Sequence, residues 1–221
     1  MKLAHPQLDT VFDFDCGKVN TIVIENPSFF RTFLRDIDSQ LHGSSGSTVL
    51  SHNDMPVSFA GNAEIIESFL SFSVNRKPLI TKLISRLESY AVNESNYIRT
   101  SNLIGELEQF ILNLSFDLPC DIFCGKMNIG SILHAVGIEI PDDYENDLER
   151  LLDYMELTRE LDRNRLFIIV NLRSFYSDDD VSLFLQSVLQ HEYKVLLVDS
   201  FARNILCNES RITVDMDLCE F

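Results

Sequence analysis

The chain has 221 residues, of which 45% are hydrophobic and 24% are charged, a balance typical of a globular protein with one large domain or two small lobes. Eighteen Lys and Arg against 34 Asp and Glu give a formal net charge of −16. This charge argues against a protein that binds nucleic acid through a surface that is basic all over. Any site for a polyanion must therefore be a local patch.

Cysteine usage and the N-terminal sequence predict a soluble cytoplasmic protein. The five cysteines are an odd, scattered set without the spacing of a secreted disulfide framework, so we expect reduced thiols. The first residues, MKLAHP, lack the apolar segment of a signal peptide. The longest uninterrupted apolar run, Leu166 to Val170, falls far short of the span of about 20 residues that crosses a membrane.

The N-terminal part of the chain predicts a strand, a helix and a hairpin, in that order. Residues 19–24 (VNTIVI) are mostly β-branched and apolar, which is typical of a strand. Asn26-Pro27-Ser28 then begins a helix over residues 29–41, with its apolar residues on one side. The stretch 42–48 (HGSSGST) predicts a flexible loop, and residues 49–59 predict two short strands joined by a turn.

The middle of the chain changes to helical periodicity. Pro78 stands where a first helical turn tolerates it, and apolar residues then recur at helix spacing. A second apolar stripe, over residues 104–114, predicts a second helix. Because only the polar link 93–96 separates the two helices, we expect an antiparallel pair that projects from another domain.

The C-terminal part predicts alternating helices and strands. A long helix over residues 143–162 precedes the apolar run 166–172 (LFIIVNL), which is typical of a strand buried on both faces. Ser177 and the acids after it predict a capped helix, and residues 195–198 (VLLV) predict a second buried strand. Strand, helix and strand with short loops imply a right-handed parallel crossover. We therefore expect an α/β sheet, with residues 212–216 as an edge strand.

One alternative is a degenerate nucleotide hydrolase. The run Val195 to Asp199 (VLLVD) is similar to the apolar strand and acid that hold Mg²⁺ in such enzymes. Their phosphate-binding loop has glycines and Lys-Ser/Thr after the first strand, but here Cys16-Gly17-Lys18 precedes that strand. An acid such as Asp199 at the end of a strand is more often a turn or cap residue.

Two groups of carboxylates suit calcium, which prefers hard oxygen ligands on irregular backbone. Asp117 and Asp121 flank Pro119 just after the predicted helix pair. A second group, between residues 142 and 147, does not match the EF-hand pattern. Acids in the first turn of a helix are also favoured by the helix dipole when no metal is present.

Charge is segregated along the chain. From Ser68 to Leu87 there is no Asp or Glu, whereas four cations stand there: Arg76, Lys77, Lys82 and Arg86. From Glu139 to Asp162, ten acids accompany only two arginines. Lys82 and Arg86 share a helix face, with the other two cations at its N-terminal end, an arrangement that suits a row of phosphates. The alternative is an ordinary solvated helix face.

Five segments follow one another in a recognisable order and spacing: Phe72–Leu83 (FSVNRKPLITKL), His134–Ile140 (HAVGIEI), Arg165–Leu172 (RLFIIVNL), Ser177–Val181 (SDDDV) and Val195–Asp199 (VLLVD). Together with an α/β start that lacks a phosphate loop, they resemble the Csn-two family of type II-A CRISPR adaptation proteins. The resemblance covers nearly the whole chain, at similar length.

The resemblance implies a degenerate P-loop-like α/β head domain over residues 1–60 and 137–221, interrupted by an inserted helical leg domain over residues 61–136. It further implies a homotetrameric ring that binds double-stranded DNA ends without sequence preference and is stabilised by calcium (Ca²⁺). Such a protein would support new spacer acquisition beside the CRISPR integrase and the type II effector nuclease, with no catalysis of its own.

The four cations of the Arg76–Arg86 stretch fit this role, because four subunits would present them repeatedly around one duplex. For calcium the resemblance carries over only Asp117 and Asp121. Relatives are rich in carboxylates between leg and head, whereas residues 116–126 hold few.

Two other interpretations stay open beside this one. The first is the nucleotide hydrolase that would use Asp199. The second is a DNA-independent scaffold that recruits acquisition proteins through the acidic helix at residues 143–162. The apolar stripe Leu103, Leu107, Phe110 and Leu114 would serve a monomer core and a subunit interface equally, so the sequence leaves the oligomeric state open.

Overall fold

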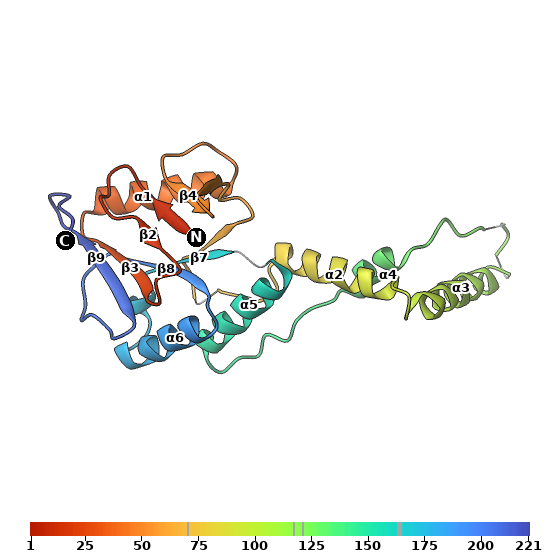
Figure 1. Ribbon diagram of the computed structural model, residues 1–221. Helices are drawn as coiled ribbons and strands as arrows, with labels where there is room; N and C mark the ends of the chain where they lie inside the picture. The colour runs from red at the N-terminus through yellow and green to blue at the C-terminus, as the bar shows by residue number, and fades with distance from the viewer. Residues whose placement is uncertain (70, 117, 121, 163–164) are drawn as a thin grey trace. The chain divides into compact units, whose positions relative to one another are not determined.

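The computed structural model describes residues 1–69, 71–116, 118–120, 122–162 and 165–221. The chain forms two units (Figure 1): the first comprises Met1–Phe72 with Tyr144–Phe221, and the second comprises Ser73–Asp143. The second unit therefore interrupts the first in sequence.

A five-stranded parallel sheet forms the centre of the first unit. Its strands, in spatial order, are β6 (Ala63–Ile66), β7 (Leu166–Val170), β8 (Lys194–Asp199), β3 (Val19–Ile24) and β9 (Glu209–Val214). All neighbouring pairs run parallel. Every residue of β3 and β7 is buried, which explains the unbroken apolar sequence of β7 and the mostly apolar sequence of β3. The predicted α/β class with a parallel sheet is confirmed.

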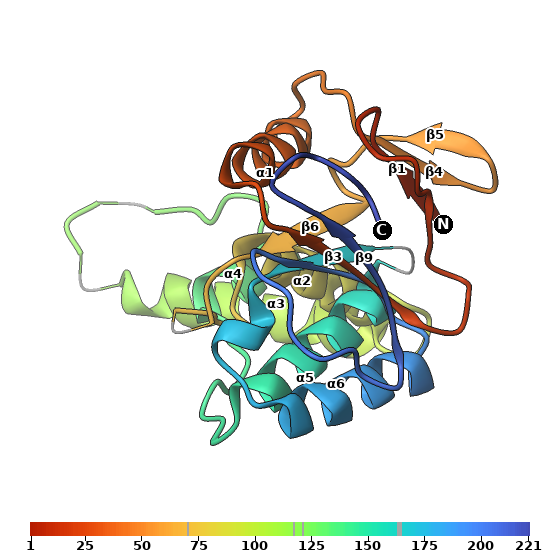
Figure 2. The ribbon, with the colours of Figure 1, turned by 90° about the vertical axis from the view of Figure 1, so that its left-hand side faces the viewer.

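Helices cover both faces of this sheet (Figure 2). α1 (Pro27–Leu41) lies on one face, and α5 (Asp147–Leu161) and α6 (Asp178–Gln190) lie on the other. The 3₁₀ turn η1 (Leu172–Ser174) leads from β7 into α6. The succession β7, α6 and β8 gives the parallel crossover expected from the sequence. Each helix buries one apolar face, which removes that surface from water.

Side-chain caps determine where these helices begin. Asn26 accepts two backbone N–H groups at the start of α1. Ser177 and Asp180 form a capping box at the start of α6, so the cap predicted at Ser177 is confirmed. α5 begins only at Asp147, later than expected, because Asn146 is its cap.

An antiparallel sheet completes the first unit on the α1 side (Figure 2). Its order is β2 (Phe12–Asp13), β1 (Lys2–Ala4), β4 (Val49–His52) and β5 (Met55–Val57). The last two form the predicted hairpin, and the two turn residues between them have φ of 51° and 58°. Positive φ at both positions fits the twist of a two-residue hairpin.

The loop at residues 42–48 is fixed by Asp36 on α1. The carboxylate accepts the backbone N–H groups of Ser47 and Thr48, each at 2.8 Å, and the Thr48 hydroxyl and Gln40 amide also donate to it. Burial raises the pKa of Asp36, but these hydrogen bonds outweigh burial and hold the pKa at about 2. The flexible loop expected from its glycines and serines is therefore fixed where it meets β4.

The second unit contains α2 (Lys77–Ala91), α3 (Tyr97–Leu114) and α4 (Ile129–Val136). α2 packs against α4 and makes few contacts with α3 (Figure 1). The expected antiparallel pairing of the first two helices is therefore wrong. The reason lies in the link, where the Tyr97 N–H donates to the Asn93 carbonyl at 2.9 Å. A helical turn continues through the link, so the chain does not reverse.

Both unit boundaries lie later in the sequence than expected. Residues 61–72, expected in the leg, belong to the first unit, where β6 pairs with β7. Residues 137–143, expected in the head, belong to the second unit, where the backbone of Ile140 pairs with Asn75. A four-residue strand such as β6 carries too little periodicity to mark a boundary in sequence.

Candidate nucleic-acid interface

The four cations predicted to bind DNA all lie at the start of α2 or along it. Arg76 is the N-cap, with an extended backbone, and Lys77 is the first helical residue. Pro78 follows in the first turn, where its missing N–H costs nothing. Lys82 and Arg86 follow further along the helix, and Lys77 and Arg86 are exposed.

The cations occupy two margins of the exposed face of α2 and do not form one row. Leu79 and Ile84 are buried and define the opposite, packed side. Lys82 and Arg86 lie about 40° apart around the helix axis, whereas Lys77 lies about 180° from Arg86. A duplex along one margin would therefore meet Lys82 and Arg86 together, with Lys77 on the far margin.

Small hydroxyl residues fill the face between these margins. Thr81, Ser85 and Ser89 are exposed, and each hydroxyl donates to the carbonyl four residues earlier, at 2.8, 3.0 and 3.0 Å. The centre of the face therefore carries only small, uncharged side chains, so the sugar-phosphate backbone of DNA could approach the helix closely. The sequence analysis missed this row, although its i, i+4 spacing is visible in the sequence.

Arg86 is held in place by Tyr90, one turn later. The Arg86 Nε donates to the Tyr90 hydroxyl at 3.0 Å, and the guanidinium lies 5.4 Å from the ring centroid. Such a contact restricts the arginine while leaving donors available. Tyr90 is another residue of this face that the sequence analysis did not select.

The first acid on α2 packs against α4. An added Cβ at Gly130 of α4 would lie 2.7 Å from Oε1 of Glu88, so the glycine permits this close approach. The margin formed by Lys82 and Arg86 precedes this carboxylate, and no acid lies between residues 68 and 87. Positive potential is therefore concentrated on this part of an acidic chain.

The predicted calcium ligands, Asp117 and Asp121, both lie outside the described residues. In the described part of the chain, no group of three or more His, Cys, Asp or Glu side chains could hold a metal ion. Of the second carboxylate group, Asp147 stands in the first turn of α5 and pairs with Arg150 at 3.1 Å. This pairing and the helix dipole account for Asp147 without a metal.

Asp199 ends β8, beside Val23 of β3, as the hydrolase interpretation requires. It is only 3% exposed, and its pKa is raised to about 6 by burial, despite the nearby Arg173. However, only Glu25 and Asn26 connect β3 to α1. A Gly-rich phosphate loop needs about eight residues at this position, so this connection is too short to form one.

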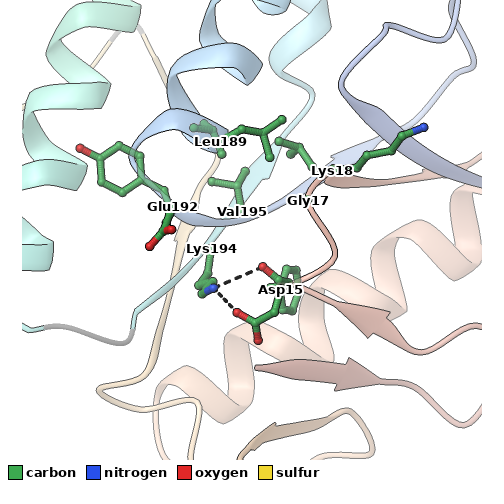
Figure 3. Close-up of a pocket in the computed structure, with 11 residues that line it drawn as sticks. Asp15, Gly17, Lys18, Leu189, Glu192, Lys194 and Val195 are labelled. Carbon is green, nitrogen blue, oxygen red and sulfur yellow. Dashed lines mark hydrogen bonds and ion pairs between the residues drawn. The ribbon is translucent and has the colours of Figure 1, made fainter.

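A cavity of about 390 Å³ lies at the opposite, amino end of β3 and β8 (Figure 3). Asp15 and Lys194 form an ion pair in it, while the Lys18 side chain extends away from this pair. The hydrogen bonds from Lys194 and the N-terminus hold the pKa of Asp15 at about 2. None of the DNA-binding or calcium-binding residues predicted from the sequence lines this cavity, and its Asp15 is paired with Lys194.

The fold and the α2 face define an α/β protein that carries a helical unit with a local cationic surface. A family model described as CRISPR-associated protein (Cas_Csn2) matches residues 40–218. The chain therefore belongs to the Cas_Csn2 family of CRISPR-associated proteins, the Csn-two family that the sequence resembles. Membership gives it a role in CRISPR adaptation, the acquisition of new spacers.

Among solved structures, the chain is similar to a putative ABC transporter (ATP-binding protein) from Pyrococcus furiosus. The identity is 13% and the TM-score 0.41, with 96% of this chain and 94% of the other covered.

Among the described residues, no helix is long and apolar enough to cross a membrane.

Proposed function

We propose that the chain is a non-catalytic, cytoplasmic protein that assembles as a homotetrameric ring and binds double-stranded DNA ends without sequence preference during spacer acquisition. The observation that carries this proposal is the cationic face of α2, which is free of acids up to Leu87 in a chain of charge −16. Lys and Arg on such a face neutralise phosphates and release counterions, a gain that does not depend on base sequence.

Self-association is supported by α3, which has no buried residue. Leu103, Leu107, Phe110 and Leu114 are all exposed on it. Their spacing of four, three and four residues places them along one stripe, as in the seam between two packed helices. The proposal assigns this stripe to a second copy of the chain, because a monomer would leave it in water. Four copies would also multiply the cations around one duplex.

The proposal treats the first unit as a degenerate P-loop-like head. The short connection from β3 to α1 and the position of Asp199 support this interpretation. The first unit would then serve assembly and partner binding without hydrolysis, with the CRISPR integrase and the type II effector nuclease as partners. ATP or GTP turnover that disappears in Asp199→Ala would contradict the non-catalytic assignment.

The proposal assigns calcium binding to Asp117 and Asp121 alone. Hard carboxylate oxygens are suitable ligands for Ca²⁺. Calorimetric titration of Ca²⁺ into the full-length protein should show binding that the double variant Asp117→Asn/Asp121→Asn loses. Equal binding by both proteins, or none by either, would remove calcium from the proposal.

The decisive test of DNA binding reverses the charge of one margin. Lys82→Glu/Arg86→Glu should weaken binding of a blunt linear duplex at least tenfold, with unchanged mass in sedimentation. Arg31→Glu/Arg35→Glu is the matched control, because these two arginines are also exposed and also four residues apart, on α1. The control should bind DNA almost as well as the unmodified protein.

The topology of the DNA tests the ring. A ring that loads over ends should retain linear duplex at a salt concentration that releases covalently closed circles of the same sequence. If the tetramer binds linear and circular DNA equally, the proposed DNA binding stands, but threading over DNA ends is excluded. Unaltered affinity in Lys82→Glu/Arg86→Glu would overturn the assignment of the α2 face.

A further inference from the structure

A groove with an apolar floor and an acidic rim lies between α5 and α6 of the first unit, and we propose that it docks a basic amphipathic helix from a protein partner. The groove has a volume of about 190 Å³. Its lining combines leucines and a phenylalanine with carboxylates: Leu148, Leu152, Leu183, Phe184, Glu149 and Asp180.

The apolar part of the groove is accessible. Leu183 is 65% exposed on α6, whereas Val181, Phe184, Leu185 and Val188 of the same helix are buried. Leu152 on α5 is half-buried beside it, and Phe184 and Leu148 form the buried floor. An apolar helix face laid across the groove would remove Leu183 and Leu152 from water and gain free energy in proportion to the area covered.

The rim carries one sign of charge. Glu149 begins a stripe of exposed carboxylates along α5 at i, i+4, i+7 and i+11: Glu149, Asp153, Glu156 and Glu160. On the other side, exposed Asp179 and Asp180 stand in the first turn of α6, which contains no Lys or Arg. The groove therefore lies between two acidic borders.

The cations of α5 are directed into other contacts. Arg150 donates to the Phe72 carbonyl at 2.7 Å and pairs with Asp147. Arg159 donates to the His191 carbonyl at 2.7 Å and reaches Glu156 only at 4.0 Å. The carboxylate of Glu149 makes no ion pair with any described residue. Asp153 accepts the Tyr144 hydroxyl at 2.9 Å and Asp180 belongs to the capping box of α6, so the rim acids without a side-chain partner among the described residues are Glu149, Glu160 and Asp179.

The charge pattern determines which kind of partner fits the groove. Repulsion from the two acidic borders disfavours DNA and anionic lipid. A helix with leucine-like anchors at i, i+3, i+4 and i+7 fits a linear apolar groove, and Lys or Arg on its flanks complements the borders. The lining runs from Asn146 to Leu152 along the chain and from Asp180 to Ser187 on α6, about two turns of helix each, so about two turns of a partner helix would contact the groove. This site goes beyond the proposed DNA binding and does not depend on it.

The test uses an 18-residue fluorescent peptide with Leu at i, i+3, i+4 and i+7 and Lys on the flanks of this apolar face, titrated with the full-length protein and followed by anisotropy. A second peptide carries Glu in place of every Lys. Leu183→Glu should weaken binding of the basic peptide at least tenfold, and Glu149→Lys/Asp153→Lys should do the same. Val11→Glu and Asp217→Lys, at exposed positions outside the groove, are the matched controls.

Loss in both groove variants, retention in both controls and no binding of the acidic peptide would support the proposal. Equal binding of the two peptides, or an unchanged affinity in Leu183→Glu, would overturn it. A lower sedimentation mass of Leu183→Glu without peptide would show that a second copy occupies the groove and would also overturn it. The DNA affinity of Leu183→Glu should equal that of the unmodified protein, which separates this site from the α2 face.

Discussion

The side chain of Asn75 pairs in both directions with the backbone of Ile140, 65 residues later. Its Nδ2 donates to the Ile140 carbonyl at 2.8 Å, and its Oδ1 accepts the Ile140 N–H at 2.7 Å. The amide thus satisfies the backbone N–H and carbonyl of Ile140, as a neighbouring β-strand would do. Because Arg76 and Lys77 follow directly, this contact fixes the start of the helix that carries the cations.

Asn75→Ala should therefore destabilise the second unit. It leaves one backbone donor and one acceptor of Ile140 without their partner, at a cost of about 1–3 kcal/mol. Hydrogen exchange should show faster exchange at Ile140 and through α2, while β3 and β7 stay protected. Asn113→Ala, which removes an exposed amide from α3, is the control. Unchanged protection at Ile140 would show that the pair is not stabilising.

Removal of Tyr90 should affect DNA binding through Arg86. Tyr90→Phe keeps the ring but loses the hydroxyl that accepts from Arg86 Nε, so we expect a two- to threefold weaker duplex affinity. Arg86→Ala should weaken binding further and reduce the log–log salt slope by about 0.9, the value for one phosphate contact. Affinities measured from 50 to 200 mM salt check both expectations. If Arg86→Ala leaves the salt slope unchanged, Arg86 does not contact a DNA phosphate.

Asp199 should make the protein less stable as pH rises from about 4 to 6. Burial raises its pKa in the folded protein to about 6, above the usual value of 3.8. Within this window the unfolded chain loses the proton while the folded protein retains it, so unfolding becomes easier by up to about 2–3 kcal/mol. Asp15 and Asp36, with pKa values of about 2, change the pH dependence of stability only at lower pH. Urea midpoints of Asp199→Asn should lack the decline, and an identical pH profile would refute the assignment.

Arg173 should be among the most sensitive positions of the first unit. It is 3% exposed, and it donates to Asp178 at 2.7 Å and pairs with the buried Glu209 at 3.5 Å. Arg173→Met leaves Glu209 as an uncompensated buried charge, at a cost of about 3–5 kcal/mol. Arg173→Met/Glu209→Leu should recover part of this loss in thermal unfolding. Arg35→Met, on the exposed side of α1, should change stability little.

Local chemistry explains which features could be predicted from the sequence. The strand at 166–170 follows from an unbroken apolar run, and the strand at 19–24 follows from residues that are mostly β-branched and apolar. The cap at Ser177 follows from the acids after it. The placement of Lys82 and Arg86 on one side of α2 follows from helical spacing. The family follows from the order of short segments, each of which is weak alone.

The sequence by itself determined the α/β class, the parallel strands and the cationic helix, because these depend on residues a few positions apart. Only the tertiary structure decided that α2 packs on α4, that the α3 stripe from Leu103 to Leu114 is exposed, and that Leu183 opens a groove between acidic borders. An apolar stripe has the same spacing whether it is covered or bare. What covers it depends on contacts between segments far apart in the chain, such as Asn75 with Ile140.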